Sequence, residues 1–250
     1  MTSVVHPDDV EPRVEDGLDV RVTFGPHNGC DLEQRLIRFG PGRHDGPDLS
    51  ERQILLYVVA GEGEIDTDGE TQRLEPGTAA FLARGDRFAI ENPGPDDLTV
   101  VSVHAPAAAD ASARKRIVRF DDQPEEEASP ERRFRYLINE DAGCMEVTQF
   151  IGIVDPSKAP FHSHPYDEVG FVLEGNGVAY VEGEEIPLRP GSCFHLAPGQ
   201  VHCIENSGPG EMRILGVFHP SDSPASRTYQ ATSAGNSRHR DMQSEKEEEG

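Results

Sequence analysis

The sequence predicts an all-β protein built from two similar barrels, and three observations lead to this prediction. Its 250 residues include 25 glycines and 20 prolines but no tryptophan, a composition that suits short strands joined by tight turns. Turn residues interrupt short apolar or alternating segments about every 8–12 residues, the spacing typical of a barrel or sandwich. The two halves of the chain also repeat one pattern of turn residues, and the length is sufficient for two domains of ordinary size.

In the first half, the clearest strand signals are residues 18–24 and 54–60. Residues 18–24 alternate apolar and polar side chains, which indicates a half-buried strand, whereas the continuous apolar run at 54–60 indicates a fully buried one. Residues 1–17 are polar and acidic, and we expect a flexible arm there. Further strands are expected at residues 32–39, 64–65, 72–74, 79–82, 87–90 and 98–104, with a loop over 40–50.

An internal repeat relates the two halves at an offset of 114 residues, which carries Gly61 onto Gly175 and Asn92 onto Asn206. The alignment needs no gap between residues 61 and 106, and the positions it retains are mainly turn formers. Backbone geometry requires such residues at fixed places. The chain is therefore predicted to be a two-fold duplication rather than an array of many small repeats.

The second half begins after a linker predicted over residues 109–132. Within the linker, residues 115–120 are expected to form a strand that crosses to pair with the other half, and residues 121–131 to be a solvated acidic segment. A wall strand is expected at 144–153 and a last strand at 212–218. The predicted domains are the first barrel over 18–108 and the second over 133–220, followed by a disordered acidic tail over 221–250.

The charge of the chain is strongly acidic, with 46 Asp and Glu against 23 Lys and Arg and a net charge of −23. Nucleic acids and anionic membranes need a cationic surface, so neither is an expected partner. The sequence has no apolar run of membrane-spanning length and no secretory signal at its start. The four cysteines lack paired metal-binding spacing, and we expect a reduced cytoplasmic protein.

Three histidines and one glutamate form the most informative pattern. His162 and His164 are two residues apart, so on a strand both side chains point to one face. Glu168 can reach the same face, and His202 must come from another strand. Four such groups that converge would bind one divalent metal ion, Fe, Mn, Ni, Zn, Co or Cu. The alternative is that the His-x-His pair is solvated or satisfied within a core.

The glycine and asparagine residues at fixed spacing around these four residues decide between the two interpretations. Residues 162–175 read His-x-His, three residues, Glu, six residues, Gly, and a second motif contains Gly191, Gly199, His202 and Asn206. Both motifs resemble those of the cupin superfamily, although Ala197 stands where the second motif usually has proline. The resemblance implies a bicupin, with two double-stranded β-helix (jelly-roll) barrels and His162, His164, Glu168 and His202 as metal ligands.

The repeat places other residues at the ligand positions of the first half. Asp48, Ser50, Ile54 and Phe88 correspond to the two paired histidines, the glutamate and His202. We therefore expect the metal motif to be intact only in the C-terminal barrel. Ile54 and Phe88 are predicted to fill the first barrel with apolar side chains. His44 lies nearby but would lack the other ligands.

For function, the resemblance implies a metal-dependent dioxygenase-type oxidoreductase that acts on a small oxygen-rich molecule, enolisable or anionic. The alternatives are a metal-dependent isomerase or lyase of the cupin type and a non-enzymatic small-molecule binding protein. Fold alone does not choose among them. A homodimer is possible by analogy with other cupins.

Several other residues are weaker candidates for the site. Tyr166 and Gln149 are the candidates for a catalytic proton donor or hydrogen-bond partner. Asn206 is expected to fix a turn rather than contact substrate. Residues expected to line the barrel cavity are Tyr180, Phe194 and Ile204.

Overall fold

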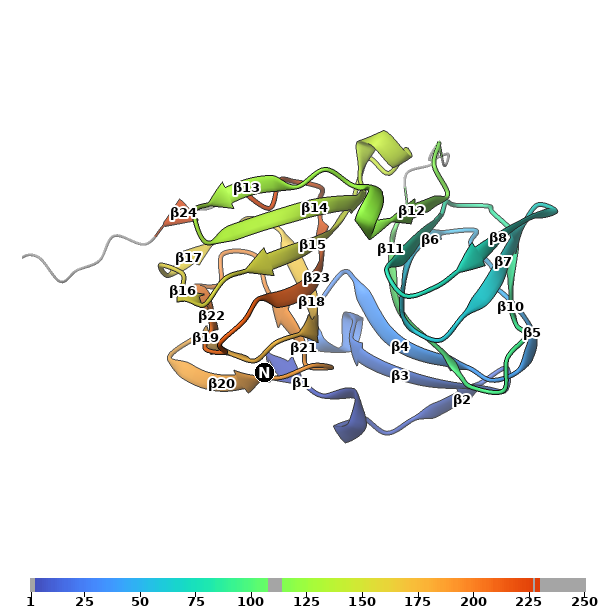
Figure 1. The fold of residues 1–250 in the computed structure, drawn as a ribbon, viewed down its shortest axis with the longest axis horizontal. Coiled ribbons are helices and arrows are strands. Elements are labelled where there is room, and N and C mark those ends of the chain that lie inside the picture. The colour runs from blue at the N-terminus through green and yellow to red at the C-terminus, as the bar shows by residue number, and fades with distance from the viewer. Residues whose placement is uncertain (1–2, 108–113, 227, 230–250) are drawn as a thin grey trace, which may run out of the picture.

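Two β-barrels lie side by side in the computed structural model of the protein (Figure 1). The structure describes residues 3–107, 114–226 and 228–229. Within these residues, helical structure is limited to the short 3₁₀ turns η1 (Pro7–Asp9), η2 (Pro26–Asn28), η3 (Phe120–Asp122) and η4 (Glu140–Ala142). None of them has the length and apolar character needed to cross a bilayer. The predicted all-β fold class is confirmed.

The first barrel combines a seven-stranded sheet, in the order β12-β9-β6-β11-β4-β3-β2, with a four-stranded sheet, in the order β5-β10-β7-β8. All neighbouring strands in both sheets are antiparallel. The strand bounds are β2 (Arg13–Glu15), β3 (Leu18–Phe24), β4 (Glu33–Phe39), β5 (Gly42–Asp45), β6 (Arg52–Ala60), β7 (Gly63–Thr67), β8 (Glu70–Leu74), β9 (Thr78–Leu82), β10 (Phe88–Asn92), β11 (Leu98–Pro106) and β12 (Ile117–Arg119).

The second barrel repeats this architecture. Its seven-stranded sheet has the order β1-β21-β18-β23-β15-β14-β13, and its second sheet has the order β20-β19-β22-β17-β24, with β16 paired to β22. The strand bounds are β1 (Val4–Val5), β13 (Glu126–Ser129), β14 (Arg132–Ile138), β15 (Thr148–Val154), β16 (Ser157–Lys158), β17 (His162–Ser163), β18 (Asp167–Glu174), β19 (Gly177–Val181), β20 (Glu184–Leu188), β21 (Cys193–Leu196), β22 (His202–Asn206), β23 (Met212–His219) and β24 (Thr228–Tyr229).

Strand β6 is continuously apolar because both of its faces are covered. Ile54 and Leu56 point into the core of the first barrel, whereas Leu55 and Tyr57 belong to a different apolar cluster. That second cluster takes residues from the seven-stranded sheets of both barrels, among them Phe171 of β18. The two large sheets therefore pack against each other, and burial of this shared apolar surface joins the barrels.

Residues 3–17 of the N-terminal arm are ordered rather than flexible as predicted, and residues 1–2 lie outside the described part of the chain. Val4 and Val5 pair with Phe194 and Cys193 at the edge of the second barrel. Figure 1 shows this blue segment running beneath that barrel, away from its own. Main-chain hydrogen bonds to an open sheet edge, rather than the polar composition of the arm, decide its structure.

The linker strand also differs from its prediction. Residues 117–119 form β12, which pairs with β9 of the first barrel and does not extend the second. At the repeat offset, β12 corresponds to the arm strand β1. The segment before each barrel thus adds an edge strand to the opposite barrel, an exchange that ties the two halves together.

Three further segments are more regular than predicted. The expected loop over residues 40–50 contains β5, and the acidic linker contains η3 and β13, which forms a hairpin with β14. In the expected tail, residues 228–229 form β24 beside β17. Residues 221–226 of the tail are also described, whereas residue 227 and residues 230–250 lie outside the described part of the chain. The predicted domain limits stay predictions.

Candidate metal centre

His162, His164, Glu168 and His202 converge in the second barrel, as their spacing predicts. His162 of β17 is the direct cross-strand partner of His202, the first residue of β22. The ring centroids of this pair lie 4.4 Å apart, and that of His164 lies 4.8 Å from that of His202. Glu168 comes from β18 and places its Oε2 3.0 Å from His164 Nε2. All three imidazoles are buried.

Each of the three histidines is anchored through its Nδ1 atom to a main-chain carbonyl. His162 Nδ1 lies 3.0 Å from the Pro160 oxygen, His164 Nδ1 2.9 Å from that of Tyr166, and His202 Nδ1 2.9 Å from that of Gln200. A carbonyl oxygen only accepts, so each Nδ1 carries the proton and each Nε2 keeps its lone pair. Hydrogen bonds of this kind fix the tautomer and the ring orientation of metal-binding histidines.

The electrostatics of the cluster suit a cation. Burial by itself would raise the pKa of Glu168, but the contact with His164 and the neighbouring His202 and His162 outweigh burial and lower it. Burial, followed by the neighbouring His162, lowers the pKa of His202 to about 4. The donors at neutral pH are therefore one carboxylate and a neutral His202 whose lone pair is available. Three imidazoles and one carboxylate fit a borderline divalent metal ion.

The four side chains line a cavity of about 90 Å³ inside the barrel. Most of its wall is apolar and aromatic, and the predicted lining residues Phe194 and Ile204 are part of it. Phe194 fits there because Gly170 lies opposite: a Cβ atom on Gly170 would be 2.0 Å from the Phe194 ring. Glycine at this strand position therefore shapes the cavity wall.

Arg132 and Arg133 bring positive charge to this cavity, and the motif does not include them. The Nη2 group of Arg132 donates to the Ile204 carbonyl at 2.7 Å, which holds the guanidinium beside the wall. Because the repeat aligns Arg132 with Leu18, neither the motif nor the duplication could have pointed to it.

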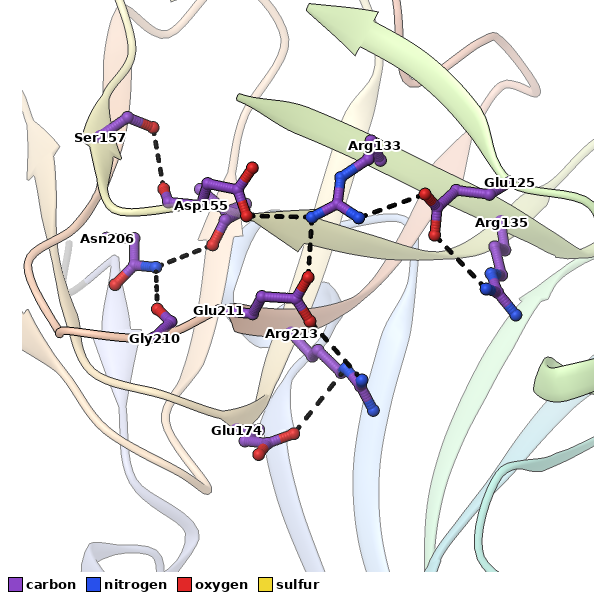
Figure 2. Close-up of polar contacts among 11 residues, drawn as sticks. Glu125, Arg133, Arg135, Asp155, Ser157, Glu174, Asn206, Gly210, Glu211 and Arg213 are labelled. Atoms are coloured by element: carbon purple, nitrogen blue, oxygen red, sulfur yellow. Dashed lines mark hydrogen bonds and ion pairs between the residues drawn. The ribbon is translucent and has the colours of Figure 1, made fainter. Parts of the chain in front are cut away.

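Arg133 has a different role at the rim of the barrel. Figure 2 shows its guanidinium between the carboxylates of Glu125, Asp155 and Glu211, at 3.2, 2.9 and 2.7 Å. These ion pairs join β14 to the segments beside β13, β15 and β23. A network of this kind is a structural device at the barrel rim.

Tyr166 lines the cavity, where its ring packs against two other side chains. The ring stacks on His164 at a centroid distance of 4.1 Å and on Phe218 at 4.4 Å. The hydroxyl lies 3.4 Å from the Ser226 carbonyl, to which it donates. Tyr166 therefore orients one of the candidate ligands.

Two predicted site residues lie outside the cavity. Gln149 is fully buried, but strand alternation directs Phe150 into the cavity and Gln149 to the opposite face, and its amide finds no hydrogen-bond partner among the described residues. Tyr180 lies on the outside of the barrel, where its hydroxyl donates to Glu205 at 2.7 Å and its ring lies 3.2 Å below the Lys158 ammonium group. Side-chain alternation along a strand could not have excluded Gln149 and Tyr180 from the cavity, because the register of their strands was not known from the sequence.

Asn206 fixes a turn, as predicted. Its Nδ2 donates to the Gly210 carbonyl (Figure 2) and to the Val154 carbonyl, both at 2.7 Å. Its Oδ1 accepts from Gly208 N at 2.9 Å. The side chain closes the segment between β22 and β23 and does not line the cavity.

The corresponding cavity of the first barrel lacks the four candidate ligands. Ile54 and Phe88 line it, as predicted, together with Ile90. His44 also lines it, but its Nε2 donates to the Gly40 carbonyl at 2.9 Å. The first barrel therefore keeps a cavity at the equivalent place but has apolar side chains at two of the ligand positions, and its own polar lining residues include Arg35 and His104.

Comparison with known protein families matches the cupin domain twice, to residues 35–104 and 151–218. An uncharacterised protein of Aquifex aeolicus is 31% identical over 75 residues, which cover 30% of this chain and 61% of that protein. The oxalate-binding protein of Thermotoga maritima is 30% identical over 63 residues, which cover 25% of this chain and 52% of that protein. The chain thus spans only about half to three fifths of the curated relatives it matches.

Solved structures that share the fold over most of the chain include the following three. Protein Ylba from E. coli superposes with a TM-score of 0.72 at 14% identity, with 88% of this chain and 91% of that chain covered. Bacillus subtilis oxalate decarboxylase, which has Mn(II) centres, gives 0.72 at 12% identity, with 91% and 79% covered. The putative glyoxylate-induced protein of Pseudomonas aeruginosa gives 0.71 at 17% identity, with 83% of each chain covered. At these identities the likeness concerns the fold alone.

Proposed function

The chain belongs to the cupin family and contains two cupin domains, and from this premise we propose that its second barrel is a metal-dependent active site for a small oxygen-rich anion. The observation that carries the proposal is the set of three histidines whose Nδ1 atoms are all held by carbonyl oxygens, so that their Nε2 atoms and Glu168 make one donor set. The reaction class we propose first is dioxygenase-type oxidation.

His162, His164, Glu168 and His202 would hold the ion. A bound divalent metal supplies Lewis acidity and, if it is redox-active, a place for dioxygen to react. The carbonyl anchors keep the imidazoles in one tautomer and orientation, so little reorganisation is needed on binding. Tyr166 supports His164 from behind, and the apolar wall excludes water.

The size and charge of the cavity narrow the substrate class. The cavity is small, at about 90 Å³, which favours a compact substrate. Arg132 lines this space, and its positive charge favours an anionic group such as a carboxylate. A short carboxylic acid of the size of oxalate meets both conditions, and the names of the Thermotoga and Bacillus relatives support that class.

A second candidate is a redox-neutral lyase or isomerase reaction, in which the same residues position a carboxylate and no oxygen is consumed. The arginine beside the donor set favours it, as does the shared fold with a decarboxylase. The third alternative, binding without chemistry, is supported by the name of the Thermotoga relative. Cytoplasmic location and a homodimer stay predictions.

One experiment separates the three candidates. The metal-free protein is loaded in turn with Fe(II), Mn(II) or Zn(II) and given oxalate, short oxo- and hydroxy-acids, diketones and catechols, while oxygen uptake, carbon dioxide release and substrate are followed. Oxygen consumption with Fe(II) or Mn(II) supports the dioxygenase class, product without oxygen uptake supports the lyase or isomerase class, and unchanged bound ligand supports a binding protein.

The matched variants are His202→Ala and Arg132→Gln. Loss of metal and turnover in His202→Ala, and a large rise in KM for carboxylates in Arg132→Gln, are the expected results. Full metal content in His202→Ala would overturn the assignment of the site.

A further inference from the structure

A second group of potential metal ligands lies between the barrels, away from the cavity of the second one. Cys30 follows η2 in the first barrel, whereas Asp167 begins β18 and His195 lies in β21 of the second. One ligand atom from each residue lies within 4.8 Å of the other two. The three residues are only 1%, 6% and 9% exposed.

We propose that Cys30, Asp167 and His195 form a divalent metal site that links the two barrels, and that the ion it binds is zinc. A thiolate, a carboxylate and a neutral imidazole around a dication give a complex without net charge, the least costly arrangement in a buried apolar interface. The sulfur donor favours zinc or cobalt over magnesium and calcium, which take oxygen ligands. Three protein ligands leave a fourth position for water.

The site is separate from the candidate active centre, although Asp167 and Glu168 are adjacent. Successive residues of a strand point to opposite faces, so Glu168 lines the cavity and Asp167 faces the first barrel. Its Oδ2 accepts a weak hydrogen bond from the main-chain N–H of Asp31, at 3.4 Å across the interface. Asp167 and His195 do not line the cavity of the second barrel.

The local contacts leave a clear place for the cation. His195 Nε2 and Asp167 Oδ1 are 2.7 Å apart, at hydrogen-bond distance. A metal ion bound to both atoms would take the place of the proton between them, and the imidazole would stay neutral by carrying its proton on Nδ1 instead. The thiol of Cys30 would lose its proton to solvent as the metal–sulfur bond forms. Without a metal, burial and then the Asp167 carboxylate raise the pKa of Cys30 to about 12, so the group is an inert thiol and no nucleophile.

The repeat supplies an internal control at the equivalent place on the other side of the interface. The positions of Cys30, Asp167 and His195 correspond there to Cys144, Gln53 and Phe81. Cys144 Sγ lies 3.8 Å from Gln53 Oε1, so the contact across the interface is retained. The amide carries no charge and the phenyl ring offers no ligand, so the same scaffold bears a ligand set on one side only.

Cobalt(II) added to the metal-free full chain tests the proposal, because a thiolate ligand gives sulfur-to-cobalt charge-transfer absorption in the near ultraviolet. The candidate active centre has no sulfur donor, so this band reports the interface site alone. We expect the band in the wild type and in His202→Ala and Cys144→Ser, and its loss in Cys30→Ser.

His195→Phe copies the residue of the opposite side and is the second loss variant, so that a folding defect in Cys30→Ser does not decide the result. Circular dichroism checks the fold of each variant. In the His202→Ala background, where the candidate active centre has lost a ligand, zinc should still raise the thermal midpoint, and adding His195→Phe should abolish that rise. A wild type without the band, or a band retained in Cys30→Ser, would overturn the interface site. Loss of the band in His202→Ala would overturn its independence from the active centre.

Discussion

Asn92 of the first barrel and Asn206 of the second make the same three hydrogen bonds, whereas Phe88 and His202, four residues earlier in each barrel, have unlike chemistry. Asn92 donates to the Phe39 and Asp96 carbonyls at 2.8 and 2.9 Å and accepts from Gly94 N at 3.0 Å, which matches the pattern around Asn206. The comparison teaches that turns hold the barrel shape while the inward-facing side chains are free to differ.

A second difference concerns how each barrel fills its interior. Leu56 faces Ala80 across β6 and β9, and the equivalent pair in the second barrel is Gly170 and Phe194. The large and small residues have exchanged strands. The total volume is roughly kept, as close packing requires, but the aromatic ring now comes from β21 and forms a wall of the candidate active cavity.

The largest expected effect is the loss of metal binding on substitution of a ligand in the second barrel, compared with the equivalent substitution in the first. His202→Ala should weaken binding of the ion in the second barrel by at least about 100-fold, because an essential donor is lost. The matched variant Phe88→Ala, at the equivalent position of the first barrel, should leave metal content unchanged. Elemental analysis and titration calorimetry check both, and an equal loss in the two variants would contradict the difference between the barrels.

The next effect tests the exchanged packing pair. Gly170→Leu should destabilise the protein by about 3 kcal/mol, because its side chain meets the Phe194 ring. The double variant Gly170→Leu/Phe194→Ala copies the first barrel and should regain most of that loss. Chemical unfolding of the wild type, both single variants and the double variant gives the coupling energy, and simple additivity would show that the two positions do not share one space.

A pH effect comes from His104, which occupies the first barrel where the second has Phe218. Burial, followed by the charge of Arg35, lowers the pKa of His104 from 6.5 to about 3. The unfolded chain therefore takes up this proton first, and stability falls as the pH drops below 6.5. Between pH 6.5 and about pH 5 the loss is about 2 kcal/mol.

The variant His104→Phe copies the second barrel and should remove this share of the acid sensitivity. Unfolding free energies of the metal-free wild type and variant at the two pH values measure it, since the similar contribution of His202 is common to both. Equal losses in the two proteins would show that His104 is not the group responsible.

The smallest expected effect concerns the shared turns. Asn92→Ala and Asn206→Ala should each cost about 1–2 kcal/mol, because each leaves buried main-chain groups without their partner. Neither variant should change metal content. Thermal and chemical unfolding check this, and a cost confined to one barrel would mean that the two asparagines are not equivalent.

Much of the architecture was predictable because turn residues carry local information. Gly175 has a positive φ of 85° and approaches the backbone of Met212 closely, so only glycine suits this position, and Gly61 repeats the geometry against Asp97 and Leu98. Glycines of this kind recur at a fixed spacing that can be recognised in the sequence. The convergence of His162, His164, Glu168 and His202 was predictable for the same reason, since spacing within strands and the repeat determine it together.

Contacts between distant segments were not predictable in this way. The pairing of Val4 and Val5 with β21 and of β12 with β9 depends on which sheet edges are open after folding. The places of Arg132 beside the cavity, of Gln149 outside it and of Cys30 beside Asp167 depend on strand register and on how two curved sheets meet. The residues that meet in these contacts are not separated by any characteristic number of residues in the sequence.

The amino-acid sequence by itself determined the all-β class, the duplication, and the restriction of the four candidate ligands to one half, because local backbone preference and side-chain spacing encode them. Only the tertiary structure decided which edges the arms complete, which arginine enters the cavity, and that a thiol, a carboxylate and an imidazole meet between the barrels. Those outcomes arise from packing two sheets against each other, where residues more than a hundred positions apart become neighbours.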